Sequence, residues 1–165
     1  MRVHAGFDDA GNEPIRRQDA GVVPIVEPEV LFDGKHTAKE CEDVMGRVLD
    51  ELFAAMRAYR VYLPGVILKT SMVLPGKDAK VAVSNTEIAQ NTIKCLKEKA
   101  PKAVGGIVFL SGGQKDEEAT INLNAMRNLG PLPWPLTFSY GRGIQNSALQ
   151  AWAKNPNDIA GAQKL

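Results

Sequence analysis

The sequence predicts an α/β protein with a parallel sheet, and three observations support this class. Short apolar runs alternate with longer amphipathic stretches, and a loop with glycine or proline follows most of the runs. Four such units follow one another, which is typical of parallel strands joined by right-handed helical crossovers. This pattern alone fits either a doubly wound sheet or part of a (β/α)8 barrel. A whole barrel takes roughly 250 residues, so four units correspond to half of one.

The first unit begins with residues 22–26, which are apolar except for Pro24 and lead into Glu27-Pro28-Glu29. A short apolar run bounded by turn residues suits a parallel strand buried on both faces. Thr37 and Glu40 then have the spacing of a capping box, which satisfies free amides at a helix start. Apolar residues recur at i, i+3, i+4 and i+7 from Cys41 to Met56, which predicts one long amphipathic helix.

Three further strands are predicted at residues 66–69, 106–110 and 136–140. The helix after the second run begins with another capping box at Ser84 and Glu87. A helix over residues 117–128 follows the third run, and one that carries Leu149 and Trp152 follows the fourth. Both tryptophans, Trp134 and Trp152, are expected to be packing residues.

The segment of residues 1–20 shows neither strand nor helix periodicity. We therefore expect a poorly ordered lead-in, with at most one short turn of helix before Gly21. Residues 21–165 carry the regular pattern and form the predicted α/β segment.

Composition excludes several classes of function. With 20 Lys and Arg against 19 Asp and Glu, the net charge of +1 gives no electrostatic reason to bind nucleic acid or an anionic membrane. No apolar run reaches the roughly 20 residues that span a bilayer. Cys41 and Cys95 fall in predicted helices without metal-site spacing, as expected for reduced thiols of a cytoplasmic protein. His4 and His36 have no nearby partner for a triad or a metal centre.

Lys69 stands at the end of the second apolar run, Val-Ile-Leu-Lys. Active sites of α/β proteins collect at the carboxyl ends of the strands. A lysine shielded from water there favours the neutral amine, which can attack a carbonyl group. The alternative is a lysine that reaches from the strand end to solvent. Judged by position alone, the alternative is the more frequent case.

Glu27 and Glu29 flank Pro28 just after the first run. Residues i and i+2 of an extended chain face the same side, so the two carboxylates are candidates for one site. Paired carboxylates separate each other's pKa values, and one can then donate a proton near neutral pH. The alternative, a solvated acidic loop, is favoured when this pair is considered alone.

Two glycine-bearing loops follow the third and fourth runs. Ser111-Gly112-Gly113-Gln114 would let backbone amides approach an anion closely. Gly141-Arg142-Gly143 adds an arginine suited to bidentate phosphate binding. The alternatives are a flexible turn and a surface arginine. The succession of both loops strengthens the phosphate interpretation, because barrels often bind phosphate between their last two βα loops.

Four segments together resemble class I fructose-bisphosphate aldolases, in the family's order and near its spacing, from about Gly21 to the end of the chain. They are Val23-Pro-Ile-Val-Glu-Pro-Glu29, Leu68-Lys-Thr-Ser-Met72, Phe109-Leu-Ser-Gly-Gly-Gln114 and Leu136-Thr-Phe-Ser-Tyr-Gly-Arg142. The resemblance implies a partial (β/α)8 TIM barrel whose four consecutive βα units correspond to the second half. The set of four segments is so specific that it overrides the structural alternatives given above for the lysine, the glutamates and the two loops. It also disfavours other Schiff-base barrel enzymes such as transaldolases.

The resemblance also implies roles for individual residues. Lys69 would form a Schiff base with the sugar ketone, Glu27 would act as acid and base, and Glu29 would lie beside Lys69 and tune its charge. A substrate phosphate would be held by two sets of residues: Ser111, Gly112 and Gly113, with Ser139, Gly141 and Arg142. No metal and no cofactor are implied, because the imine on Lys69 serves as the electron sink.

The implied reaction is the reversible cleavage of fructose 1,6-bisphosphate to dihydroxyacetone phosphate and glyceraldehyde 3-phosphate, in glycolysis and gluconeogenesis. The family usually forms tetramers, so self-association is expected. The family's first four strands have no counterpart here, and the sequence looks truncated at both ends. We therefore expect the chain alone to be a poor aldolase. The alternative is a catalytically incomplete fragment that acts at most as a phosphate-binding or interaction module.

Overall fold

The computed structural model describes residues 3–4 and 13–165. The expectation of a poorly ordered lead-in lies outside the described residues for positions 1–2 and 5–12. A helix before Gly21 is present as α1 (Glu13–Asp19), but its seven residues exceed the single turn expected. The side chain of Gln18 ties this helix to the body, because it accepts from the Tyr62 amide and donates to the Tyr62 carbonyl.

The main sheet has four parallel strands in the order β2-β4-β5-β6. Its strands are β2 (Ile25–Val26), β4 (Ile67–Thr70), β5 (Gly106–Phe109) and β6 (Leu136–Phe138). The predicted α/β class and all four strand positions are confirmed. The strands lie side by side in chain order, without the reversal of order that marks a doubly wound sheet. A separate antiparallel pair joins β1 (Val3–His4) to β3 (Glu29–Val30).

A helix follows each strand of the main sheet. The helices are α2 (Ala38–Ala58), α3 (Asn85–Lys99), α4 (Asp116–Arg127) and α5 (Arg142–Lys154), with the short elements η1 (Leu63–Gly65) and α6 (Ile159–Ala162). Thr37 and Glu40 form the predicted capping box of α2. At α3 only half of the predicted box is present, since Ser84 accepts from the Glu87 amide and the described contacts hold no reciprocal bond.

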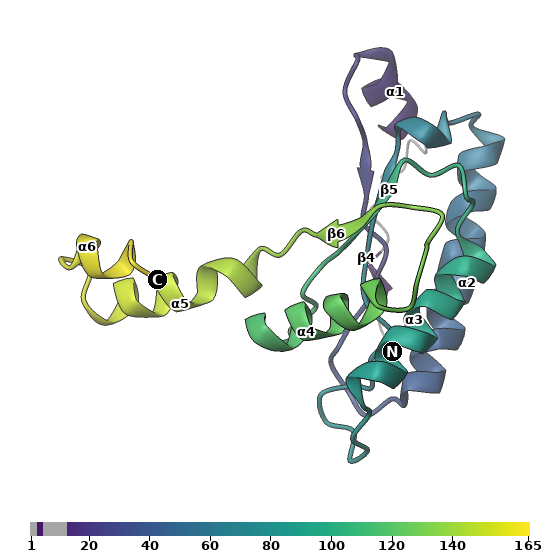
Figure 1. Cartoon of the computed structure of the whole chain (residues 1–165). Coiled ribbons are helices and arrows are strands. Elements are labelled where there is room, and N and C mark those ends of the chain that lie inside the picture. The colour runs from purple at the N-terminus through teal and green to yellow at the C-terminus, as the bar shows by residue number, and fades with distance from the viewer. Residues whose placement is uncertain (1–2, 5–12) are drawn as a thin grey trace.

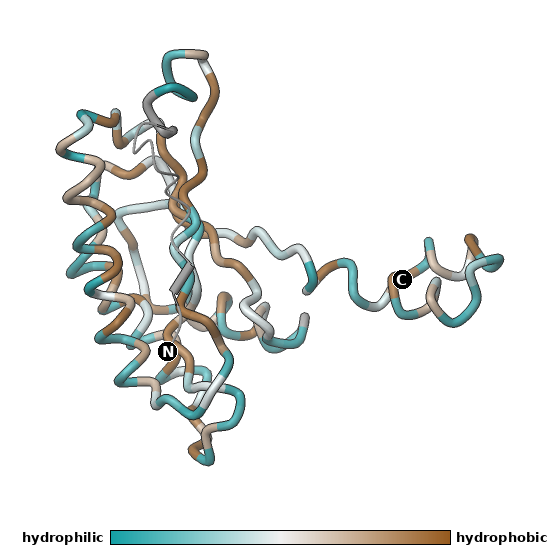
Figure 2. The backbone as a smooth tube through the Cα atoms, turned by 180° about the vertical axis from the view of Figure 1, so that it is seen from behind, coloured by the Kyte–Doolittle hydropathy of each residue, from teal (hydrophilic) through white to brown (hydrophobic). Residues whose placement is uncertain are grey.

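The helices bury one face of the sheet. Leu68, Ile107 and Phe109 lie fully buried in a core shared with α2, α3 and α4, whereas Lys69 and Val108, which alternate with them, are only partly buried. Figure 1 shows α2 and α3 side by side along one side of the sheet, and Figure 2 shows hydrophobic and hydrophilic positions alternating along α2. The expectation of strands buried on both faces is therefore wrong for this sheet.

The C-terminal helices α5 and α6 extend away from the sheet (Figure 1). Trp152 of α5 is 50% exposed, so the expectation that it packs in the interior is wrong. Trp134 is 3% exposed and donates its indole N–H to the Pro101 carbonyl at 2.8 Å, which confirms its packing role. The two tryptophans thus mark the covered and uncovered parts of the molecule.

The two cysteines are free, buried thiols, as predicted. Burial raises the pKa of Cys41 to about 11 and that of Cys95 to about 12. Both are therefore protonated at neutral pH and unreactive. Within the described part of the chain, no helix is long and apolar enough to cross a membrane.

Candidate active site

Lys69 and Glu27 meet at the carboxyl ends of two neighbouring strands. Lys69 is the third residue of β4, and Glu27 directly follows β2, which pairs with β4. The Lys69 Nζ atom lies 3.0 Å from Glu27 Oε2. The lysine side chain is 21% exposed and the glutamate side chain 50% exposed. Lys69 is thus mostly shielded and paired with a carboxylate on the sheet face that the helices leave uncovered.

This geometry permits proton transfer between the two groups. A separation of 3.0 Å is within the reach of general acid–base catalysis. Glu27 can take a proton from the Lys69 ammonium, which leaves an amine able to attack a carbonyl. The same carboxyl group can then return the proton to an oxygen that leaves as water.

Glu29 takes a different place from Glu27. It lies in β3 opposite His4 of β1 and lines a groove of about 190 Å³ together with Gly112, Gly113 and Arg142. Among the described residues, the ion pair of Lys69 is with Glu27. The placement of Glu29 beside Lys69 stays a prediction.

The loop after β5 has a conformation that requires glycine. Gly112 and Gly113 have φ values of +60° and +90°, in the left-handed region. A Cβ atom on Gly113 would come within 3.1 Å of Phe32. Ser111, at the start of the loop, is buried. The two glycine amides have no partner among the described hydrogen bonds, so both are available to an anion.

The loop after β6 lies against the first loop. The Ser139 amide donates to the Phe109 carbonyl at 2.8 Å, Gly141 caps α5, and Arg142 is its exposed first residue. A Cβ atom on Gly143 would lie 3.2 Å from the Cβ atom of Ser111, so the absence of a side chain lets the loops touch. The predicted phosphate residues of the two loops are thereby neighbours.

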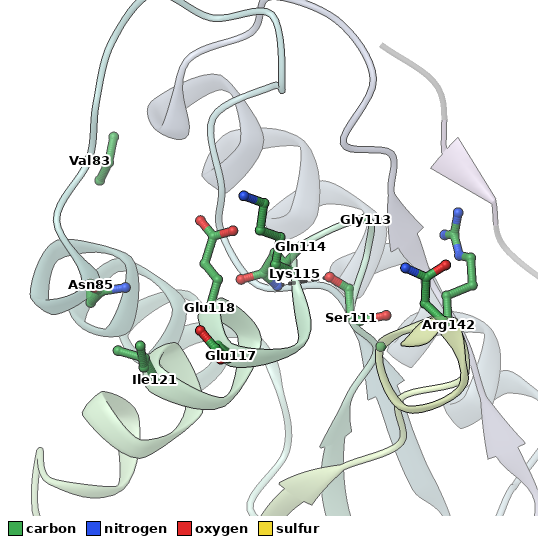
Figure 3. A pocket seen from close by; sticks show the side chains of 12 residues that line it. Val83, Asn85, Ser111, Gly113, Gln114, Lys115, Glu117, Glu118, Ile121 and Arg142 are labelled. Carbon is green, nitrogen blue, oxygen red and sulfur yellow. Dashed lines mark hydrogen bonds between the residues drawn. The ribbon is translucent and has the colours of Figure 1, made fainter. Parts of the chain in front are cut away.

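A cleft of about 900 Å³ opens between these loops and the starts of α3 and α4. Figure 3 shows Ser111, Gln114 and Arg142 among the side chains that line it. The smaller groove that contains Glu29 shares Gly113 and Arg142 with this cleft. Arg142 therefore faces both hollows.

Asn122 and Asn85, which connect to Gln114 through hydrogen bonds, were not among the residues predicted for the site. The sequence could have indicated Asn122, because this asparagine stands among the apolar positions of α4, one turn after Ala119 and next to Leu123. A polar residue at a core position of a helix calls for a buried partner. Across the described ranges, 3–4 and 13–165, no three histidine, cysteine or carboxylate side chains form a metal-binding group.

The fold and this pair of groups define an α/β protein with a lysine and a carboxylate at the carboxyl edge of a parallel sheet. Residues 15–165 match the model of the family "Fructose-bisphosphate aldolase class-I". The chain belongs to the class I fructose-bisphosphate aldolase family, which confirms the resemblance. Members of this family use a Schiff-base lysine and need no metal.

Three relatives illustrate the match. A probable fructose-bisphosphate aldolase class 1 of Xanthomonas axonopodis is 49% identical over 90% of this chain and 45% of its own length. A cytosolic aldolase of Arabidopsis thaliana, aldolase 5, is 51% identical over 88% of this chain and 41% of its own. A solved structure of the Plasmodium falciparum aldolase, in complex with TRAP and a small-molecule inhibitor, has a TM-score of 0.81 and 43% identity over 87% of this chain and 41% of that one. The chain spans less than half the length of these relatives.

Proposed function

We propose that this chain contributes the imine-forming part of a fructose-bisphosphate aldolase, a lyase of glycolysis and gluconeogenesis. The observation that carries the proposal is the Lys69–Glu27 pair at the carboxyl edge of the sheet. Membership of the class I family supports it. Fructose 1,6-bisphosphate is the proposed substrate, and its phosphate would bind at Ser111, Gly112, Gly113, Ser139, Gly141 and Arg142.

The reaction begins when the Lys69 amine adds to the C2 ketone of the sugar. Glu27 protonates the resulting hydroxyl group, which leaves as water and produces a protonated imine. The imine accepts the electron pair of the C3–C4 bond while a base takes the C4 hydroxyl proton, and glyceraldehyde 3-phosphate departs. Protonation of the enamine at C3 and hydrolysis of the imine then release dihydroxyacetone phosphate. Glu29 is proposed to adjust the charge around Lys69.

We further propose that the four βα units form the second half of a (β/α)8 barrel. The chain-order sheet and the match to 41% of the Plasmodium aldolase support this arrangement. The two outer strands, β2 and β6, each have one edge without a described partner strand, and Ile25 and Phe138 are exposed there. Such edges favour self-association. A cytoplasmic location is proposed because two Arabidopsis relatives are named cytosolic.

A second candidate is a phosphate-binding or interaction module without lyase activity. It is favoured by one observation: the two glycine loops contact each other, whereas the sheet face that carries Lys69 lies partly open. Loss of one supporting catalytic group commonly costs about 10²- to 10⁴-fold in rate. Phosphate binding would survive in such a module while turnover would not.

Borohydride reduction in the presence of dihydroxyacetone phosphate tests the first proposal. Mass spectrometry should find one reduced adduct on Lys69, and Lys69→Met should abolish it. Lys80→Met is the matched control, because Lys80 is an exposed lysine beyond the strand end. An adduct spread evenly over surface lysines, or none at saturating ligand, contradicts the imine proposal. Phosphate binding without any adduct would favour the second candidate.

A further inference from the structure

We infer that a row of three amide side chains, Asn85, Asn122 and Gln114, positions the Ser111–Gly113 loop to bind phosphate. The row starts at α3, crosses α4 and ends in the loop itself. This inference rests on the proposed function, because it concerns the phosphate part of the same site. Its members act through the loop and are therefore positioning residues.

The row is continuous, and it runs from the exposed Asn85 into the interior. The Asn85 amide donates to Asn122 Oδ1 at 2.6 Å, and Asn122 Nδ2 donates to Gln114 Oε1 at 2.8 Å. Asn122 is fully buried and Gln114 nearly so. Asn122 and Gln114 each use both their donor and their acceptor in the row, so rotation of either side chain would break two bonds.

The last member of the row holds the loop carbonyl. Gln114 Nε2 donates to the Ser111 carbonyl at 3.0 Å, and the Gln114 backbone amide donates to the same oxygen at 3.0 Å. In a trans peptide the C=O and the following N–H point in opposite directions. Because the Ser111 carbonyl is held towards Gln114, the Gly112 amide points away from the row and stays available to an anion.

The same helix also holds the second loop. Tyr140, which is buried, donates its hydroxyl to the Ala119 carbonyl of α4 at 2.9 Å. Burial raises the pKa of Tyr140 to about 12, so the phenol stays protonated and keeps this bond. Ala119 and Asn122 are one turn apart on α4. The helix therefore sets the distance between the Ser111 loop and the Arg142 loop.

Packing alone does not require amides at these positions. Leucine would fill the Asn122 site without needing a partner, whereas an amide there must find both of its bonds. Removal of Asn122 would leave Gln114 Oε1 buried and unpaired, and the loop would relax to satisfy it. The expected effect is a loss of phosphate affinity of about tenfold, the size of one buried hydrogen bond left unmade.

The test compares a phosphorylated and an unphosphorylated ketone on the 165-residue chain. In Asn122→Leu, the dihydroxyacetone phosphate concentration that half-saturates borohydride trapping on Lys69 should rise about tenfold. Trapping of dihydroxyacetone, which has no phosphate, should be unchanged. Asn124→Leu is the matched control, since Asn124 is exposed on the same helix. Equal losses for both ketones, or no change for the phosphorylated one, would overturn the inference.

Gln114→Met separates the row from the stability of the helix. The methionine side chain has about the same length but cannot donate to the Ser111 carbonyl, and it adds no charge near the phosphate, so the variant should reproduce the phosphate-specific loss. This variant carries the test if Asn122→Leu does not fold. If the native chain forms no adduct, the imine proposal fails separately. Titration with inorganic phosphate, followed by the NMR shifts of the Gly112 and Gly113 amides, then decides the inference by the same tenfold criterion.

Discussion

Helices cover the two middle strands of the sheet, β4 and β5, better than they cover the outer strands. Phe109 of β5 and Phe138 of β6 are partners in strand register, yet the first is 0% exposed and the second 51% exposed. Helices α2, α3 and α4 cover the middle strands, whereas α5 points away from β6. The contrast teaches that a strand forms from local pattern and pairing, while burial of its side chains needs a neighbouring layer.

The largest expected effect comes from truncating this matched pair. Phe109→Ala should lower the free energy of unfolding by about 3–5 kcal/mol, because it opens a cavity in the core. Phe138→Ala should cost less than about 1 kcal/mol, since half of its side chain already meets water. Urea denaturation of the two variants measures the difference. Equal losses would mean that β6 is covered in solution.

A glycine pair extends the comparison to the loops. A Cβ atom on Gly76 would lie 2.3 Å from the Gly34 carbonyl oxygen. An alanine at position 76 would therefore force apart the loop that contains Gly76 and the loop that contains Gly34. Gly76→Ala should therefore cost about 1–3 kcal/mol. Gly141→Ala, at the start of the uncovered α5, meets nothing within 4 Å and serves as the control. Thermal unfolding distinguishes the two, and an equally large loss at Gly141 would contradict the open position of α5.

The ion pair between α2 and α3 at Glu42 should make the stability of the covered part of the molecule depend on pH. The hydrogen bond from Lys94, helped by Lys39, holds the pKa of Glu42 below its ordinary value of 4.5. Because the pKa of Glu42 is lower in the folded state than in the unfolded state, its ionised form stabilises the fold at pH values above the ordinary pKa. This stability is lost as the pH falls through the lowered pKa of the folded state. Glu42→Gln should therefore destabilise at pH 7, by less than about 1 kcal/mol because both lysines are exposed.

The difference between the native chain and Glu42→Gln should vanish in acid, below the lowered pKa. Glu51→Gln, at an exposed position of the same helix, is the control and should change stability little at either pH. Urea denaturation at several pH values measures both variants. A difference that persists unchanged into acid would mean that the ion pairs contribute nothing and that the substitution acts through packing.

The smallest expected effect is on fluorescence rather than stability. Acrylamide should quench Trp152 strongly and Trp134 weakly in dilute protein, in line with their exposure. Single-tryptophan variants, Trp134→Phe and Trp152→Phe, separate the two signals. Self-association over α5 would shield Trp152 as the concentration rises. A quenching rate of Trp152 that is independent of concentration would contradict an interface there.

Most of the element order was predictable, because strand and helix periodicity and capping are local properties. The positions of Lys69 and Glu27 after neighbouring strands followed from the same pattern, and their roles came from the resemblance. The exposure of Phe138 was not predictable, since it depends on the direction α5 takes. Nor was the amide row, because Asn85, Asn122 and Gln114 meet only once α3 and α4 pack together.

The order β2-β4-β5-β6 has a consequence for symmetry. The two outer edges of the sheet belong to different strands, and about a twofold axis an edge strand can pair with its own copy only in the antiparallel sense. Two copies could close into one ring of parallel strands only by joining β6 of each to β2 of the other. That ring would have a twofold axis along its centre and two identical seams. Both Lys69 side chains would then lie on the same rim, one in each half of a shared opening.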